Sequence, residues 1–205
     1  MDAVPPPAPS PGRSPYDAAP AEAARVPPPV LDWAALPPVL RRELRASHLG
    51  EAVAVRLYDG VADATDDPDA RRFARHHREV EEIHLARLRR LVPAGGESRL
   101  LAPCRAGGWL MGWLPAKVGG PRTFYAVLAA VEGWVDGHYA GQIALARRLG
   151  APPGLVELLE ACRSDESHHA GDAARLAGRP GPLARLLAAV AVACSRAGVA
   201  LARRL

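Results

Sequence analysis

Apolar residues recur at intervals of three and four along four long segments of the chain, and this spacing predicts four amphipathic helices. Aromatic and β-branched residues are scarce, whereas Ala, Leu and Arg are abundant, which favours helices over strands. The predicted helices cover approximately residues 39–62, 68–91, 122–149 and 155–176. Segments 65–69 and 150–154 are rich in Asp or in Gly and Pro and predict turns, so the chain is expected to be all-α with two helical hairpins.

Two other segments are apolar. Residues 107–114, in the stretch of about thirty residues between the second and third helices, include two Trp and are much too short to span a bilayer. They could belong to the core, but Trp at the edge of an apolar run favours a membrane surface. Residues 183–205 predict a last helix that is too interrupted for a clear membrane span. This helix could pack on the bundle, lie in a membrane interface or form a dimer surface.

The first thirty residues contain ten prolines and no long apolar run. This composition predicts a disordered tail over residues 1–36, followed by one folded domain over residues 37–205. The tail lacks the apolar core of a secretory signal, and it is too rich in proline and acidic residues for an amphipathic transit peptide. The sequence therefore predicts a protein on the soluble side with a flexible N-terminal extension.

Charge and cysteine content argue against several classes of protein. The formal net charge is +4, but the Arg residues lie beside Glu and Asp in the helices and form no basic block. Nucleic-acid binding is therefore not expected, and an anionic membrane surface is the better partner. Cys104, Cys162 and Cys194 are isolated, which predicts a reducing compartment and no disulfides. The sequence has no Gly-x-Gly-x-x-Gly motif, so no nucleotide-binding domain is expected.

Carboxylates and imidazoles occupy apolar stripes of the four helices in a pattern that occurs twice. A lone Glu on one helix is followed by Glu-x-x-His on the next, and residues three apart share a helix face. The six residues are Glu51 with Glu81 and His84, then Glu132 with Glu166 and His169. A carboxylate in an apolar stripe is costly unless it is paired or binds a cation. The pattern therefore marks these residues as candidates for one site.

Their positions along the helices provide a geometric test. In an antiparallel helix pair, residues equidistant from the turn lie at one level. The midpoint between Glu51 and its Glu-x-x-His partner falls near residue 67, and the midpoint for Glu132 falls near residue 150. Both midpoints lie in predicted turns. All six side chains are therefore expected at one level of the bundle.

A rival register exists on the fourth helix. Asp165 and His168 are also three residues apart, but their face of the helix is more polar than the face of Glu166 and His169. We therefore expect Glu166 and His169 to be the inward pair.

Four carboxylates and two imidazoles inside a four-helix bundle form the ligand set of a di-iron or di-manganese carboxylate centre. Oxygen and nitrogen ligands suit Fe, Mn or Zn, and the lack of thiolates argues against an iron–sulfur cluster. Two divalent cations would balance carboxylates that otherwise repel one another. The long connection between the second and third helices fits the crossover of a ferritin-like fold. The alternative is that these are surface Glu and His residues of an Arg-rich bundle.

The residues around these positions resemble the demethoxyubiquinone hydroxylase family over about residues 40–205. The matching stretches are Leu-Arg-Ala-Ser-His-Leu-Gly-Glu at 44–51 with Arg-Leu-Tyr at 56–58, Glu81-x-x-His84-Leu85, Ala-Val-Glu at 130–132 with His138-Tyr139-x-x-Gln142-Ile143, and Arg163-x-Asp165-Glu166-x-x-His169. All six ligand positions are filled. One departure is Ser47, where the family typically has Asp before the His.

The resemblance implies a membrane-associated di-iron monooxygenase that adds a ring hydroxyl late in ubiquinone biosynthesis, converting demethoxyubiquinone to demethylubiquinone. In such an enzyme the six residues hold two Fe ions and O₂ is the co-substrate. Electrons come from an external reductant, such as NADH, or through the bound quinone. His48 and Tyr139 are candidates for groups that orient the carboxylates, and His138 is a further one, although core packing explains them equally well.

The resemblance also implies partners and a location. A polyprenyl quinone is expected to enter from the bilayer between residues 109–114 and the helix at 183–201. Other ubiquinone-biosynthesis proteins and a second copy of the chain are further candidate partners. The expected location is peripheral, on the cytoplasmic side of a bacterial inner membrane. Two alternatives stay open: a ferritin-like oxidase or hydroxylase of another lipid or secondary metabolite, and a non-catalytic metal-binding bundle.

Overall fold

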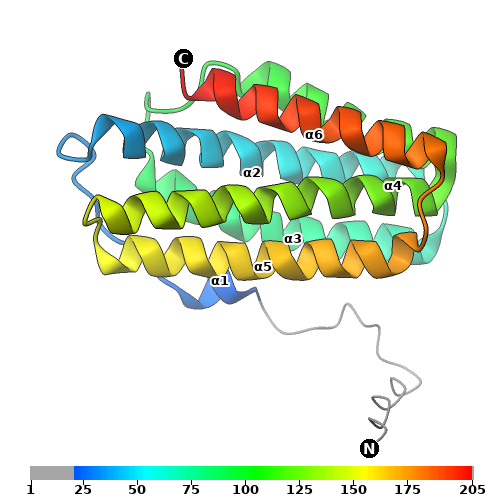
Figure 1. Cartoon of the computed structure of the whole chain (residues 1–205), viewed down its shortest axis with the longest axis horizontal. Helices are drawn as coiled ribbons and strands as arrows, with labels where there is room; N and C mark the ends of the chain where they lie inside the picture. The colour runs from blue at the N-terminus through cyan, green and yellow to red at the C-terminus, as the bar shows by residue number, and fades with distance from the viewer. Residues whose placement is uncertain (1–20, 205) are drawn as a thin grey trace, which may run out of the picture.

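The computed structural model describes residues 21–204, so residue 205 and the predicted tail up to residue 20 lie outside the described part. The regular structure of the described part is entirely helical, and its long helices form a bundle (Figure 1). The helices are α1 (Glu22–Arg25), α2 (Pro38–Ala64), α3 (Pro68–Leu91), α4 (Leu101–Arg148), α5 (Pro153–Ala177) and α6 (Pro182–Ala202). The predicted all-α, ferritin-like bundle with an extra C-terminal helix is confirmed.

Local sequence signals fix where the bundle helices begin and end. A proline occupies the first turn of α2, α3, α5 and α6, where its missing N–H costs no helical hydrogen bond. Asp67 also caps α3, because its side chain accepts hydrogen bonds from the N–H groups of Asp69 and Ala70. Gly150 has a φ of 64° and makes the tight turn between α4 and α5. Both predicted hairpin turns are therefore present.

The helix α4 is interrupted at Gly120, which has a φ of 68° and a ψ of −171°. Glycine adopts this conformation without strain, and Pro121 then suits the first turn of a new helical run. We call residues 101–119 the crossover helix, and the part after Gly120 belongs to the bundle. The sequence predicts the bundle part from residue 122 and only a short apolar segment, residues 107–114, before it. Gly and Pro residues within the crossover helix hid its helical character.

The crossover helix lies against α2 with the two backbones in contact. A Cβ atom on Gly112 would lie 1.9 Å from the carbonyl oxygen of Leu57, and one on Gly60 would lie 2.0 Å from that of Trp109. Both obstacles are backbone atoms, so rotation of a side chain could not make room for a methyl group. The approach also allows the Trp109 indole to donate a hydrogen bond to Asp63 over 2.8 Å. Glycine is therefore required where these helices cross.

The C-terminal helix α6 packs along α2 and α4 by one face (Figure 1). Its buried residues are small: Ala184, Ala188, Ala191, Val199 and Ala202. Its opposite face includes Leu186 and Val190, which are at least half exposed. Among the described helices, only α6 is long and apolar enough to cross a membrane by length and composition. The Arg residues of this segment predicted a helix too interrupted for a clear membrane span, but α6 is continuous and meets this criterion of length and composition.

Residues 21–36, which the sequence assigned to the disordered tail, pack on the bundle, and we call them the strap. Within the strap, α1 lies against α3 and α5 (Figure 1), and Ala23 is fully buried. Val26 and Trp33 pack against the same apolar cluster, and Leu36 is buried in it. The high proline content concealed these isolated apolar contacts. We therefore propose that the folded domain begins before residue 37.

The two largest clusters of the apolar core lie toward opposite ends of the bundle. One cluster includes Leu44, Leu88 and Leu158, and the other includes Phe73 and Leu128. The four bundle helices contribute to both clusters. Between them lies a layer of polar side chains, which is where the sequence pattern placed the candidate site.

Replacing Gly112 by Ala should destabilise the protein, because the added methyl group meets the backbone of Leu57. Such overpacking typically costs about 1–3 kcal/mol of unfolding free energy. Gly107→Ala is the matched control on the same helix, since no atom lies within 4 Å of a Cβ added there. This control should keep or slightly raise stability, because Ala favours helix by up to about 1 kcal/mol. Urea denaturation followed by circular dichroism measures both, and equal stabilities would contradict the close crossing.

Candidate metal centre

The six residues marked by the sequence pattern lie together in the middle of the bundle. α2 and α4 each contribute one Glu, whereas α3 and α5 each contribute a Glu and a His. These residues are Glu51, Glu81, His84, Glu132, Glu166 and His169, and none is more than 3% exposed. The two hairpins therefore bring both sets to one level, as the midpoints required.

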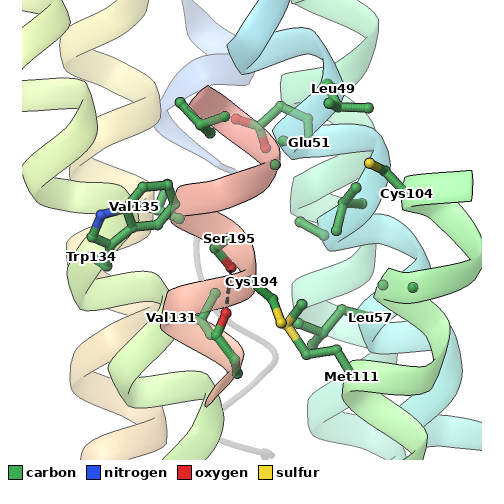
Figure 2. A pocket seen from close by; sticks show the side chains of 18 of the residues that line it. Leu49, Glu51, Leu57, Cys104, Met111, Val131, Trp134, Val135, Cys194 and Ser195 are labelled. Atoms are coloured by element: carbon green, nitrogen blue, oxygen red, sulfur yellow. Dashed lines mark hydrogen bonds between the residues drawn. The ribbon is translucent and has the colours of Figure 1, made fainter. Parts of the chain in front are cut away.

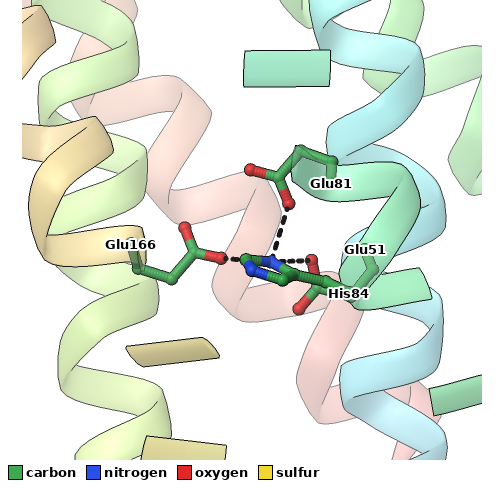
Figure 3. A group of neighbouring side chains, drawn as sticks. All are labelled: Glu51, Glu81, His84 and Glu166. Atoms are coloured by element: carbon green, nitrogen blue, oxygen red, sulfur yellow. Dashed lines mark ion pairs between the residues drawn. The ribbon is translucent and has the colours of Figure 1, made fainter. Parts of the chain in front are cut away.

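The ligand-type atoms of the six side chains form two overlapping groups. Glu81 and Glu166 belong to both groups, whereas each remaining pair of Glu and His belongs to one. Within each group the oxygen and nitrogen atoms lie within 4.8 Å of one another. Figure 3 shows one group, in which the carboxylates of Glu51, Glu81 and Glu166 surround the His84 ring. This arrangement could hold two cations with the shared carboxylates between them.

Both histidines present the same ring atom to the shared carboxylates. Nδ1 of His84 lies 3.2 Å from a Glu166 oxygen and 3.4 Å from a Glu81 oxygen. Nδ1 of His169 lies 2.9 Å from Glu81 and 3.7 Å from Glu166. The two imidazoles are therefore equivalent in how they face the centre of the cluster.

Several atoms of the cluster have no hydrogen-bond partner despite full burial. The atoms without a partner are both carboxylate oxygens of Glu81 and of Glu166, and Nδ1 of His84 and of His169. Buried polar atoms are normally satisfied by hydrogen bonds. Convergent oxygen and nitrogen atoms without such bonds are the donor set that iron, manganese or zinc would take. The residues present therefore fit a dinuclear metal centre.

Burial and neighbouring charges give the carboxyl groups unequal pKa values when no cation is bound. Burial raises the pKa of Glu51 to about 8 and holds that of Glu132 well above its ordinary value. Burial acts in the same direction on Glu81, but the two histidine rings beside its carboxylate outweigh it and hold its pKa well below the usual range. For His84 and His169, burial acts to lower the pKa, but the surrounding anionic groups raise it well above normal. The cluster thus retains protons near neutral pH, which a cation would displace.

Two tyrosines donate hydrogen bonds to the unshared carboxylates. Tyr139 of α4 donates to Glu51 of α2, and Tyr58 of α2 donates to Glu132 of α4 over 2.7 Å. Each tyrosine follows the Glu of its own helix by seven residues, so the two helices exchange the same contact. Tyr139 was among the predicted orienting groups, whereas Tyr58 was not. The equal spacing after Glu51 was the signal that could have identified Tyr58.

Asp165 is a second residue whose part in the site was not predicted. Its buried carboxylate lies 3.0 Å from Nε2 of His84. Burial acts to raise the pKa of Asp165, but hydrogen bonds with His84 and with backbone N–H groups lower it, so the group is a carboxylate and Nε2–H donates. When the ring gives up its second proton on binding a cation, Nδ1 is the lone-pair atom that faces the cluster. The polar face of α5 therefore meets His84 of α3 through Asp165, whereas His168 on that face is exposed.

The other two predicted orienting groups do not contact the cluster. His48 is fully buried and its ring nitrogens have no hydrogen-bond partner, although Nε2 lies 3.9 Å from Glu97 in the loop before the crossover helix. His138 lies 2.9 Å from the amide of Gln142 and stacks on Trp134. Sequence spacing places both residues near a Glu of the cluster, but the contacts of their rings are with Glu97, Gln142 and Trp134.

A largely apolar cavity of about 550 Å³ joins the surface to the cluster (Figure 2). Its inner walls include the carboxylates of Glu51 and Glu132. Its outer walls include Leu110 of the crossover helix and Val190 of α6, each about half exposed. This volume lies within the range of about 300–1,000 Å³ for small-molecule sites. A ligand entering between these two helices would therefore reach the unshared carboxylates.

Ser47, the position that departs from the resembled family, also lines this cavity. Its hydroxyl lies 2.9 Å and 2.7 Å from the oxygen and nitrogen of the Gln142 side-chain amide. The substitution therefore alters the cavity wall and not the metal-binding cluster.

The fold is a ferritin-like bundle, and its buried cluster of carboxylates and imidazoles fits a dinuclear metal centre. Residues 38–202 match the family described as "Ubiquinone biosynthesis protein COQ7". The chain belongs to this family, and the resemblance found in the sequence is confirmed.

Similar proteins carry the name "3-demethoxyubiquinol 3-hydroxylase". The protein of this name from Paracidovorax citrulli (strain AAC00-1) is 34% identical over 165 residues, which are 76% of this chain and 78% of the relative. The one from Azoarcus sp. (strain BH72) is 33% identical over 142 residues, or 68% of each chain. The one from Laribacter hongkongensis (strain HLHK9) is 31% identical over 147 residues, or 70% of each chain.

Metal binding should release protons from the cluster. Between the ordinary pKa of 4.5 and the folded value of about 8 for Glu51, the folded chain without a cation holds a proton that the unfolded chain has lost. Its stability therefore falls as the pH rises through this window. Binding of Co²⁺ requires the ionised carboxylate and displaces the proton. Calorimetric titration near neutral pH, in buffers of different ionisation enthalpy, should show net proton release.

The same protonation should be visible in thermal unfolding. The melting temperature of EDTA-treated protein should be lower near pH 8 than near pH 6, and saturating Co²⁺ should reduce this difference. Uptake of Co²⁺ without any proton release would contradict the protonated state of the cluster.

Proposed function

We propose that this chain is a di-iron monooxygenase that hydroxylates the ring of a polyprenyl demethoxyquinol in ubiquinone biosynthesis. One observation carries the proposal: an apolar cavity joins an exposed apolar mouth to a buried cluster with donor atoms for two cations. A protein that only stores metal needs the cluster but no approach for a lipid. Membership of the family and the names of the relatives support the hydroxylase reaction.

In the proposed enzyme, Glu81 and Glu166 would help to hold both irons, because these carboxylates belong to both ligand groups. Glu51 and His84 would hold one iron, and Glu132 and His169 would hold the second. Iron is proposed because hydroxylation with O₂ requires a redox-active cofactor, and the oxygen and nitrogen donors of the cluster suit iron.

The proposed reaction inserts one atom of O₂ into a ring C–H bond and releases the other atom as water. It consumes two electrons and two protons, which an external reductant such as NADH supplies directly or through the quinone. The irons, when bound, supply the redox chemistry that activates O₂. The protein holds the ring beside the cluster and excludes bulk water with apolar walls. Tyr58 and Tyr139 keep the unshared carboxylates oriented through their hydrogen bonds.

The cavity suits a substrate with an apolar tail and a polar ring. Leu110 and Leu114 of the crossover helix face the mouth together with Val190 of α6, so the tail would contact apolar side chains. Ser47 and His138 bring polar groups to the same walls, where they could bond the oxygen atoms of the ring. A different lipid of this chemistry would fit the mouth equally well, which makes the ring the part of the substrate to test.

Exposed apolar faces on two neighbouring helices support attachment to a membrane surface. Leu114 and Val118 of the crossover helix and Leu186 and Val190 of α6 are all more than a third exposed. Because α6 also buries one face along the bundle, a helix lying in the interface explains it better than a span. We propose a peripheral position on the cytoplasmic side of a bacterial inner membrane. Other ubiquinone-biosynthesis proteins and a second copy of the chain are further proposed partners.

Isotope labelling tests the proposed reaction. Protein loaded with Fe²⁺ should incorporate one atom of ¹⁸O from ¹⁸O₂ into a short-tailed demethoxyquinol in the presence of NADH, as detected by mass spectrometry. Glu81→Gln removes a charge from both metal positions and should lower turnover by roughly 100-fold or more. Glu82→Gln is the matched control, since its carboxylate is exposed on the same helix.

Product without ¹⁸O, or equal turnover in these two variants, would contradict the proposed monooxygenase. Incorporation of ¹⁸O into another lipid, but not into the demethoxyquinol, would leave the metal centre standing and reject the named substrate.

A further inference from the structure

The strap contacts the metal-binding cluster from outside through one carboxylate. One oxygen of Asp165 accepts a hydrogen bond from the N–H of Glu22 over 2.8 Å. The other oxygen accepts from the N–H of Ala23 and from Nε2 of His84, both over 3.0 Å. Asp165 therefore joins the backbone of the strap directly to a residue of the cluster.

Arg87 holds the same part of the strap from α3. Its guanidinium donates from Nε to the carbonyl of Ala23 over 3.2 Å and from Nη2 to that of Ala24 over 2.7 Å. Arg87 follows His84 by three residues, so both contacts come from one face of α3. Ala23 has no exposed surface and packs into the apolar cluster at this end of the bundle. The backbone of the strap is thus held by hydrogen bonds to Asp165 and to Arg87, and the buried side chain of Ala23 adds to the attachment.

This contact concerns one half of the cluster. Asp165 immediately precedes the Glu-x-x-His motif of α5. The residue that immediately precedes the Glu-x-x-His motif of α3 is Val80. An apolar side chain cannot accept a hydrogen bond from His169, so the twofold pattern of the bundle does not extend to the strap. The strap therefore distinguishes His84 from His169, although both face the shared carboxylates with Nδ1.

We propose that the strap is a positioning element for one of the two metal positions. Docked, it fixes Asp165, and Asp165 holds His84 with Nδ1 directed at the cation. The inference rests on the proposed function, because it requires His84 to bind metal. Removing the partner of a histidine ligand typically lowers metal affinity by about 10–100-fold. Since coupling between two binding events is reciprocal, metal at this position should in turn hold the strap in place.

Undocking the strap should weaken one Co²⁺ position and leave the other unchanged. Ala23→Asp buries an additional carboxylate next to Asp165 and should release the strap. Val30→Asp is the matched control, because it adds the same charge where the strap is fully exposed. Titration with Co²⁺, followed by visible absorption in competition with a chelator, should give two positions in the unsubstituted chain and in the control. Ala23→Asp should lose affinity at one of them by roughly tenfold or more.

Proteolysis of the unsubstituted chain tests the coupling from the other direction. Arg25 is exposed and is followed by Val26, so trypsin can cleave there once the strap is released. Arg99, exposed in the loop before the crossover helix, is an internal control within the same molecule. By reciprocity, Co²⁺ should slow cleavage after Arg25 by roughly tenfold relative to cleavage after Arg99.

The outcomes separate the two levels of inference. An unsubstituted chain that takes up no Co²⁺ would reject the metal centre and the strap inference together. Two Co²⁺ positions of unchanged affinity in every variant, with equal effects of Co²⁺ on cleavage after Arg25 and Arg99, would reject the strap inference alone. If Ala23→Asp does not fold, the proteolysis of the unsubstituted chain decides the question.

Discussion

The burial of four carboxylates in the middle of a helical bundle is the constraint on which the rest of the structure depends. Carboxylates removed from water are stable only when they are protonated, hydrogen-bonded or bound to cations. Here Glu51 and Glu132 each receive a tyrosine hydroxyl, and Glu81 faces two imidazoles. The donor atoms that lack hydrogen bonds converge on two positions suited to cations. The apolar clusters on either side of this layer complete the bundle around it.

The cluster has two different sides. Toward α2, α4 and α6 it borders an apolar cavity. The outer wall of this cavity is formed by the crossover helix and α6, which contribute no residue to the cluster. Toward α3 and α5 it is backed by Asp165 and the strap. The approach for substrate and the contacts that support His84 thus lie on opposite sides of the cluster. This division explains how an apolar molecule could reach the cluster without disturbing the contacts that orient His84.

Much of the site followed from the sequence, because helix periodicity and distance from a turn fix the level of a side chain in an antiparallel pair. The six cluster residues met as expected for this reason. Asp165 was assigned to the outer face because polar neighbours were equated with solvent, whereas a residue of another helix satisfies it. The strap and the crossover helix were hidden by Pro and Gly, whose average preferences conceal individual contacts such as those of Ala23 and Gly112. The resemblance implied an entrance between residues 109–114 and the C-terminal helix, but the shape of the cavity could not be predicted, since it depends on how three separate helices pack.

Mössbauer spectroscopy combined with elemental analysis of protein reconstituted with ⁵⁷Fe²⁺ tests most directly whether the buried layer is a dinuclear metal centre. Two irons per chain are expected, in oxygen and nitrogen coordination and magnetically coupled through the shared carboxylates of Glu81 and Glu166. Fewer than one iron per chain after reconstitution, or iron confined to a single uncoupled position, would contradict the dinuclear centre.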